Sequence, residues 1–265
     1  MAVILGGSGS FPTIFLHVSQ TFVPPQDGKI MIHVIGAGGA GSASLNDGQL
    51  AGGAAGGYCR KNSLAVTTSG SFTVTIGAGG AGVVGSASAG QTGGTTSVAG
   101  TGLSSTLTST GGAGGALNNT QFNNAGGGSN GDVNRTGGPG GYRIGGGAIG
   151  LTTTGNPGQN AGTYNDSFGG SSDILGDFYS SSLGQLSGSA GGIGFFNSNN
   201  ASSGADSTTA GPLAGAGGRG IQSVNGSANA HASIGGGGGF SYSNAVQNLR
   251  SGRGGQGCVV IQYIP

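Results

Sequence analysis

The stretch "KIMIHVIGAGGAG", residues 29–41, joins a continuous apolar strand pattern to a run of glycine and alanine. Its glycines Gly36, Gly38 and Gly41 match G-x-G-x-x-G, the fingerprint that holds a pyrophosphate in dinucleotide-binding folds. The stretch "FTVTIGAGGAG", residues 72–82, repeats the same design further along the chain. The fold of this protein depends on whether a helix comes after the glycines in the two copies.

A dinucleotide site requires a helix directly after the glycines and an acidic residue about 20 positions later. Residues 42–59 contain further Gly-Gly pairs, and each glycine costs a helix about 1 kcal/mol. No Asp or Glu occurs between Asp47 and Asp132. We therefore expect no dinucleotide site and no other cofactor, and we interpret both copies as strands that lead directly into glycine-rich segments.

The composition argues against a helical protein. Glycine supplies 67 of 265 residues, charged residues make up 6%, and neither Glu nor Trp occurs. The residues that favour exposed helix positions are therefore scarce. Disordered chains combine low hydrophobicity with high net charge, whereas this chain is 34% hydrophobic with a formal net charge of +1. We expect a folded protein with almost no α-helix.

The distribution of charge and the sequence of the N-terminus indicate which classes of partner to exclude. The eight cations are scattered along the chain, so a clustered basic surface for nucleic acid is not expected. The N-terminal apolar run is broken by Gly6, Gly7, Gly9 and Pro12, which predicts neither a secretory signal nor membrane insertion.

Cys59 and Cys258 are too few for a disulfide framework. Buried free thiols are expected, with a single bridge between them as the alternative.

Strand patterns lie near the two ends of the chain. Alternating or continuous apolar runs rich in Val, Ile, Thr and Phe occur at 14–18, 29–35, 63–67, 71–76 and 258–264. They predict a small β-sandwich-like region from about 25–100 and 256–265. The fold class expected is all-β and irregular.

The middle of the chain consists of short glycine runs separated by variable polar segments. Representative runs are 111–115, 126–128, 137–141, 235–239 and 252–257. Glycine runs can be flexible linkers, but linkers would supply no core. Alternatively, each run is one polyproline-II-like helix with about three residues per turn, whose backbone groups bond to neighbouring runs. We expect a packed polyglycine-II array over about 101–255, with variable loops at its two ends.

Glycine lets such backbones approach closely because it has no Cβ. The glycines expected to form this scaffold lie in the repeated motif and in the later runs. They are Gly36, Gly38, Gly39, Gly41, Gly77, Gly79, Gly80, Gly82, Gly137, Gly138, Gly140, Gly141, Gly237, Gly254 and Gly255.

The ordered motifs resemble the glycine-rich domain at the tips of bacteriophage tail fibres. The motifs that carry the resemblance are "FVPPQDGKIMIHVIGAGGAG" (22–41), "GGAAGGYCRKNSLAV" (52–66), "FTVTIGAGGAG" (72–82), "GQTGGTTSV" (90–98), "GGGGG" (235–239) and "GGQGCVVIQY" (254–263). The resemblance implies a polyglycine-II sandwich like that of the distal adhesins of T-even-type long fibres. Residues 1–24 show no clear counterpart of their attachment domain.

The resemblance implies a protein that recognises a host cell and performs no catalysis. Residues 25–265 would be the receptor-binding domain, and its host receptor would be an outer-membrane protein, a pilus or a polysaccharide. Residues 1–24 would be an attachment segment for a tail-fibre or baseplate protein. The protein would be assembled in the host cytoplasm and carried at the fibre tip of the virion. Fibres are commonly threefold, which favours a homotrimer, whereas the T-even-type adhesins are single chains, which favours a monomer.

Aromatic residues in the variable segments are the candidates for receptor contact. Rigid aromatic rings among Ser, Gly and Asn are typical of binding surfaces such as antibody paratopes. Alternatively, these rings cap the ends of the glycine array. The candidates are Phe122, Tyr142, Tyr164, Phe168, Phe178, Tyr179, Phe195, Phe196 and Tyr242. Residues 164–179 and 195–200 are the favoured segments.

Other functions have weaker support in the sequence. No His or Cys spacing indicates a metal site. Asp173 and Asp177 could form a carboxylate pair for hydrolysis of a surface polysaccharide, but an active site needs a convergent set of titratable groups and few are present. His17 and His33 lie in apolar strand patterns and are expected to pack as ordinary strand residues. A structural or ice-binding polyglycine-II protein is the remaining alternative.

Overall fold

The computed structural model describes most of the first half of the chain and both ends of its second half. The residues described are 2–5, 12–45, 50–117, 123–141, 159–160, 166–168, 220–222, 234–238, 241–242 and 250–265. Within these ranges the regular elements are β-strands and none is an α-helix. The all-β expectation is confirmed for this part of the chain. No helix among these residues is long and apolar enough to cross a membrane.

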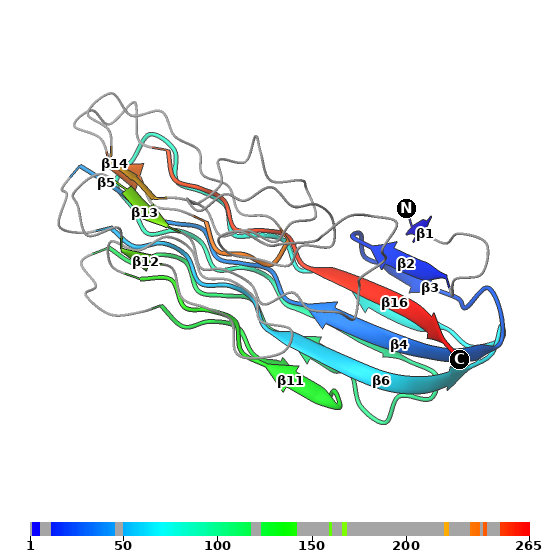
Figure 1. Cartoon of the computed structure of the whole chain (residues 1–265). Helices are drawn as coiled ribbons and strands as arrows, with labels where there is room; N and C mark the ends of the chain where they lie inside the picture. The colour runs from blue at the N-terminus through cyan, green and yellow to red at the C-terminus, as the bar shows by residue number, and fades with distance from the viewer. Residues whose placement is uncertain are drawn as a thin grey trace.

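Two antiparallel sheets form the body at one end of the molecule (Figure 1). The first sheet has the order β1 (Ala2–Leu5), β2 (Thr13–Leu16), β16 (Cys258–Ile264), β4 (Gly28–Ile35), β6 (Tyr58–Val66) and β11 (Val133–Arg135). The second sheet has the order β10 (Gly128–Ser129), β9 (Leu107–Ser109), β8 (Thr96–Gly100), β7 (Phe72–Thr75) and β3 (Gln20–Phe22). The C-terminal strand thus lies between strands from the N-terminal part of the chain.

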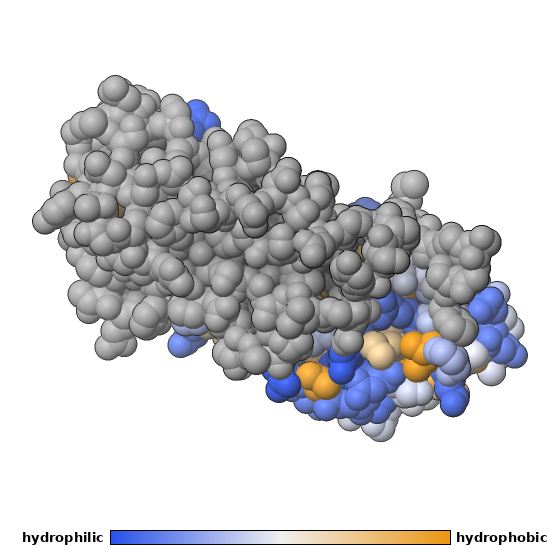
Figure 2. All heavy atoms as spheres, viewed as in Figure 1, coloured by the Kyte–Doolittle hydropathy of each residue, from blue (hydrophilic) through white to orange (hydrophobic). Residues whose placement is uncertain are grey.

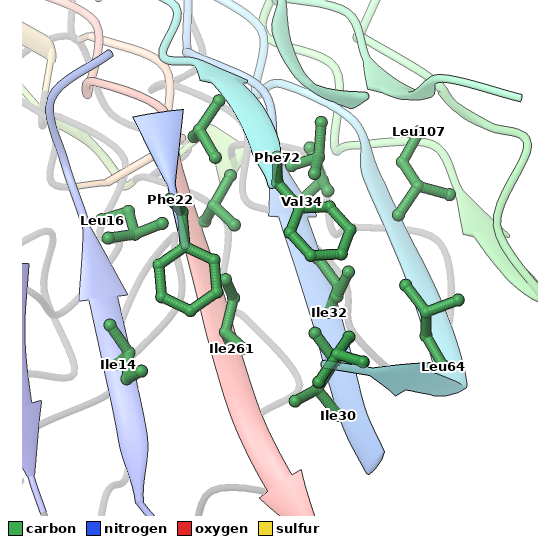
Figure 3. Packing of buried hydrophobic residues seen from close by; sticks show 14 of the residues in the cluster. Ile14, Leu16, Phe22, Ile30, Ile32, Val34, Leu64, Phe72, Leu107 and Ile261 are labelled. Carbon is green, nitrogen blue, oxygen red and sulfur yellow. The ribbon is translucent and has the colours of Figure 1, made fainter. Parts of the chain in front are cut away.

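The main core lies where the inward faces of these sheets meet. Alternate residues of β4, namely Ile30, Ile32 and Val34, are fully buried in it, as the period-2 pattern of a strand requires. Phe72 of β7 and Phe22 of β3 pack as a tilted aromatic pair with ring centroids 6.2 Å apart. Figure 3 shows these side chains pointing into one apolar layer. This is the β-sandwich that the sequence predicted.

A second cluster covers the other face of the first sheet. It contains Phe15, Ile35, Tyr58 and Val260 from four adjacent strands, together with Ile234 from the glycine-rich part of the chain. The sandwich and the glycine-rich region therefore share buried apolar contacts.

The two cysteines are both free thiols. Cys59 packs in the main core, whereas Cys258 packs in the second cluster, so the first sheet separates them. The bridge that the sequence left open as an alternative is not formed.

Residues 1–24, expected as an attachment segment, supply strands to both sheets. β2 pairs with β16 through Phe15 and Val260, and β3 pairs with β7 through Phe22 and Phe72. The described part of this segment is therefore part of the sandwich, because its apolar side chains fill positions in the shared core.

Figure 2 shows that the described surface in that view is largely hydrophilic, with few hydrophobic residues.

A third sheet of short strands lies at the opposite end of the molecule (Figure 1). Its order is β12 (Gln159–Asn160), β13 (Asp166–Phe168), β14 (Gly220–Gln222), β15 (Ser241–Tyr242) and β5 (Ala43–Ser44). β14, β15 and β5 are parallel to one another, whereas β12 and β13 are antiparallel to their neighbours.

Candidate functional site

The glycine-rich segments between the sheets form one array whose hydrogen bonds run between segments. The described segments of the array are 36–42, 50–57, 77–83, 88–95, 110–117, 123–127, 136–141, 234–238 and 250–257. Several of them lie before residue 101, where the sequence suggested that the array would begin. Where the residues of a strand give way to Gly and Ala, the strand ends and a segment of the array begins.

The central segment, residues 36–42, shows the period of the array. The amides of Gly36 and Gly39 donate to segment 50–57, through Gly57 and Ala54. The amides of Ala37 and Ala40 donate to segment 88–95, and those of Gly38 and Gly41 donate to segment 250–257. The central segment therefore donates a hydrogen bond to the same neighbouring segment at every third residue. A repeat of three residues without internal hydrogen bonds is the signature of a polyglycine-II helix.

The carbonyl groups of the central segment bond to a different set of neighbours. Gly112 and Gly115 of segment 110–117 donate to Ala37 and Ala40. Gly80 donates to the carbonyl oxygen of Gly38, and Gly238 donates to that of Gly39. The central segment is thus enclosed on all sides, and its buried polar groups are paired as burial demands.

The spacing of glycine and alanine in "GAGGAG" follows from this packing. A Cβ on Gly38 would lie 1.9 Å from the carbonyl oxygen of Gly236, and one on Gly39 would lie 2.1 Å from that of Ala113. Ala37 and Ala40 are also fully buried, but their methyl groups are accommodated. One position in three can therefore carry a side chain. The match to the dinucleotide fingerprint is a consequence of this three-residue repeat.

The structure places all the expected scaffold glycines in the array. An added Cβ would come within 3 Å of a neighbouring backbone at most of them, at Gly36, Gly38, Gly39, Gly77, Gly79, Gly80, Gly82, Gly137, Gly140, Gly237 and Gly254. The others take part in bonds between segments, which are made by Gly41, Gly138, Gly141 and Gly255.

The array has two chemically different ends. At one end its segments continue into sandwich strands, so that Ile35 of β4 precedes Gly36, and Gly57 precedes Tyr58 of β6. At the other end the chain turns between segments or leaves the array. We call this other end the distal end; it carries Leu45, Val84, Leu117, Gly141 and Arg250.

Both chain termini lie on the sandwich side of the array (Figure 1). Ile264 pairs with Lys29 at the start of β4, which is the end of that strand remote from Gly36. The N-terminal strand β1 pairs with β2 of the same sheet.

Two of the candidate receptor residues lie on described backbone at the distal end. Tyr242 in β15 is the register partner of Ser44 in β5, which continues the central segment. Phe168 in β13 is the register partner of Gln159 in β12, on the same sheet. The structure thus brings Phe168 and Tyr242 into one sheet at the distal end.

The other candidates lie outside the described residues. They are Phe122, Tyr142, Tyr164, Phe178, Tyr179, Phe195 and Phe196. Tyr142 directly follows Gly141 in the chain, and Phe122 directly precedes Asn123. Both neighbours are described, and both lie at the distal end.

Polar side chains hold the array together at the distal end. Asn123 is buried, and its Nδ2 donates to the carbonyl oxygen of Gly52 at 2.8 Å while its amide donates to that of Gly140 at 2.7 Å. Ser251 is also buried, and its hydroxyl accepts a hydrogen bond from the amide of Val83 at 2.8 Å. Sequence reasoning missed both residues. The signal in the sequence that could have identified Asn123 and Ser251 is the position of each polar residue at the boundary of a glycine run.

Small exposed apolar groups complete the described distal surface. Val84 is 63% exposed and Leu45 is 37% exposed. Between segments 77–83 and 88–95 the chain turns at Gly85, whose φ of +66° favours glycine. Val84 forms an isolated bridge with Arg250.

Among the described residues, the most strongly perturbed titratable groups lie in the sandwich, away from the distal end. His33 is fully buried; its Nδ1 lies 2.7 Å from the Tyr58 hydroxyl and its Nε2 lies 3.2 Å from Oε1 of Gln262. Burial lowers the pKa of His33 to about 3, against the opposing effect of the hydrogen bond that its Nε2 makes to Oε1 of Gln262. A neutral, hydrogen-bonded imidazole in a core suits a structural role, as expected for a strand histidine.

Among the described residues no group of three or more His, Cys, Asp or Glu side chains could hold a metal ion. Lys61 and Asp132 form an ion pair at 2.7 Å on the surface of the sandwich. The amide of Asn62 also donates to Asp132, and these contacts lower the pKa of its carboxyl. Asp173 and Asp177, the possible carboxylate pair, lie outside the described residues.

Comparison with known protein families gives a match that covers most of the chain. The profile of a family described as a glycine-rich domain matches residues 17–264. The matched region includes the strands from β3 to β16 and the whole array. No curated protein matches the chain.

Proposed function

We propose that this chain, which belongs to the glycine-rich domain family, is a tail-fibre tip adhesin that carries a bacteriophage to its host. In this proposal the array is a rigid support, and the segments that leave its distal end bind a receptor on the bacterial surface. The sandwich end attaches to a tail-fibre or baseplate protein. The protein acts by binding and catalyses no reaction.

The observation that carries the proposal is the separation of the two ends. The termini and the sandwich lie at one end of the array, whereas β13 and β15, with Phe168 and Tyr242, lie at the other. An adhesin needs this division because one end must join the virion while the other reaches the cell. The array between them supplies stiffness, since its backbone groups are bonded to several neighbours at once.

The array also explains how such a protein could change its receptor. The sequence of the array is constrained by close backbone contacts, such as those at Gly38 and Gly39. In this proposal the segments beyond the array are under no such constraint, so that they can vary in length and side chains. Binding residues are commonly found on loops held by a rigid scaffold.

A binding assay on intact host cells tests the proposal. Purified protein is fluorescently labelled, and residues 164–200 are replaced by the corresponding segment of a related protein from a phage with another host. The exchange should transfer binding to the second host. A matched control replaces the sandwich turn at 101–106, which lies at the other end of the molecule, and should leave binding unchanged.

The proposal fails if the unaltered protein binds no cells, or if exchange of 164–200 leaves the host range as it was. Incubation with host surface polysaccharide provides a separate check. Release of shorter saccharides would support the hydrolase alternative and contradict a purely binding role.

A further inference from the structure

One layer of the molecule carries no charged side chain. No Asp, Glu, Lys or Arg occurs between Lys61 and Asp132. This part of the chain forms β7 to β10 and the array segments 77–83, 88–95, 110–117 and 123–127. About a quarter of the residues in an ordinary soluble domain are charged. We call this sheet and these segments the uncharged layer.

The sheet part of the uncharged layer exposes small polar side chains. In β7 the side chains alternate between the two faces of the sheet. Phe72 and Val74 point into the core, and Thr73 and Thr75 are exposed. Thr73 pairs with Ala99 of β8, and Thr75 pairs with Ser97. The outward face of this sheet is therefore made of Thr, Ser and Ala.

The array part continues the same kind of surface. Ala78 and Ala81 are exposed on segment 77–83, and Thr92 and Thr95 are exposed on segment 88–95. Each pair is separated by three residues, so its members lie on one side of a polyglycine-II helix. The exposed side chains of these segments are uncharged and mostly small, with the carboxamides of Gln91 and Asn124 as the larger polar groups.

Two backbone amides of the uncharged layer bond to no described residue. In segment 110–117 the amides of Gly112 and Gly115 bond to the central segment, and that of Ala113 bonds to segment 123–127. The amides of Gly111 and Gly114 have no hydrogen-bond partner among the described residues. They recur at the three-residue spacing of the array. They resemble the open donors of an edge strand, which pair readily with another chain.

The layer is large enough for a specific interface. Array segments rise about 3.1 Å per residue, while strands rise about 3.3 Å per residue and lie about 4.8 Å apart. Seven array residues continued by four strand residues, across four or five adjacent segments, give a face of roughly 35 by 20 Å. That approaches the roughly 800 Å² per partner of a standard protein interface.

We propose that the uncharged layer is the contact face between two copies of this chain. A twofold dimer places the same patch of each copy against the other. The absence of charge on both faces removes electrostatic repulsion, and their small side chains allow close approach. The amides of Gly111 and Gly114, which bond to no described residue, have the three-residue spacing that matches the carbonyl groups of another polyglycine-II segment, as inside the array. A second copy supplies such segments, and their rise per residue is the same.

Sedimentation velocity at several protein concentrations tests this proposal on the full chain. The variant Thr73→Lys/Thr92→Lys places two charges on the layer, at exposed positions of its sheet and array parts. The control Gln26→Lys/Ser63→Lys adds the same charge at exposed positions outside the layer. The unaltered protein and the control should be dimers. The layer variant should have a dissociation constant about 100-fold higher or more, because like charges would face each other.

Circular dichroism shows whether each variant retains the fold. If the double variant does not fold, Ala81→Lys, also exposed on an array segment, takes its place. A monomeric unaltered protein overturns the proposal, as does an oligomer that the layer substitutions leave intact. A monomer that produces thermal hysteresis in ice growth also overturns it, and would assign the layer to ice instead.

Discussion

Gly38 donates its amide hydrogen to the carbonyl oxygen of Gly255 across an N···O distance of 2.8 Å. This bond joins the first segment of the array to the last. The central segment is therefore enclosed only when the C-terminal part of the chain has returned between β2 and β4. Contacts so far apart in sequence are made late in folding because loop closure must precede them. We expect the array and the sandwich to unfold together.

The first prediction concerns acid stability. The folded pKa of His33 is about 3, whereas an unfolded histidine has a pKa of about 6.5. The unfolded state therefore binds the proton more readily between these values. The contribution of His33 to stability should be complete above pH about 6.5 and should decrease as the pH falls toward 3, by up to about 1.4 kcal/mol per pH unit.

Urea denaturation between neutral pH and pH 4 measures this dependence. His33→Gln keeps a polar side chain beside Tyr58 and Gln262 but cannot be protonated. Its free energy of unfolding should depend less steeply on pH than that of the unaltered protein, whatever its value at neutral pH. Equal slopes for the two proteins would show that another group controls acid unfolding.

The second prediction concerns the distal end. Asn123→Ala removes the donor to the carbonyl oxygen of Gly52 and leaves that oxygen unpaired. Loss of a buried hydrogen bond should lower the free energy of unfolding by about 1–3 kcal/mol. The adjacent Asn124→Ala is the control, because the Asn124 side chain is exposed and its removal should change stability by less than about 0.5 kcal/mol. Equal effects of the two substitutions would contradict the assigned role of Asn123.

The third prediction concerns the thiols. Burial raises the pKa of both Cys59 and Cys258, and the reactive form of cysteine is the thiolate. Neither should react with iodoacetamide in the folded protein, and both should react after denaturation. Mass spectrometry of the alkylated protein distinguishes the two states. Rapid labelling of either thiol under native conditions would mean that the first sheet opens at β6 or β16.

The sandwich was predictable because its strands carry local signals. The patterns at 29–35 and 258–264 correspond to β4 and β16, where residues buried on both faces give continuous apolar runs. β9 was missed because its three residues, Leu107–Ser109, are too short to show a period. The order of strands could not be predicted either. Nothing in the local pattern indicates that β16 inserts between β2 and β4.

The existence of the array was predictable from composition, but its extent was not. Gly-Gly-Ala repeats at 36–41 and 77–82 look like the ends of strands, and only the period-three bonds show that they belong to the array. Asn123 and Ser251 could not be identified because their roles depend on partners distant in sequence. Of the candidate receptor residues, the structure locates the backbone of Phe168 and Tyr242.

Paired alanine substitutions test most directly whether side-chain-free backbones are packed against one another. A Cβ on Gly38 would overlap the carbonyl group of Gly236, whereas a Cβ on Gly127 would meet no atom within 4 Å. We predict that Gly38→Ala lowers the free energy of unfolding by about 3 kcal/mol or more. Gly127→Ala should leave it unchanged or raise it by up to about 1 kcal/mol. If chemical denaturation shows the two variants to be equally stable, the close-packed array does not exist and the account built on it is wrong.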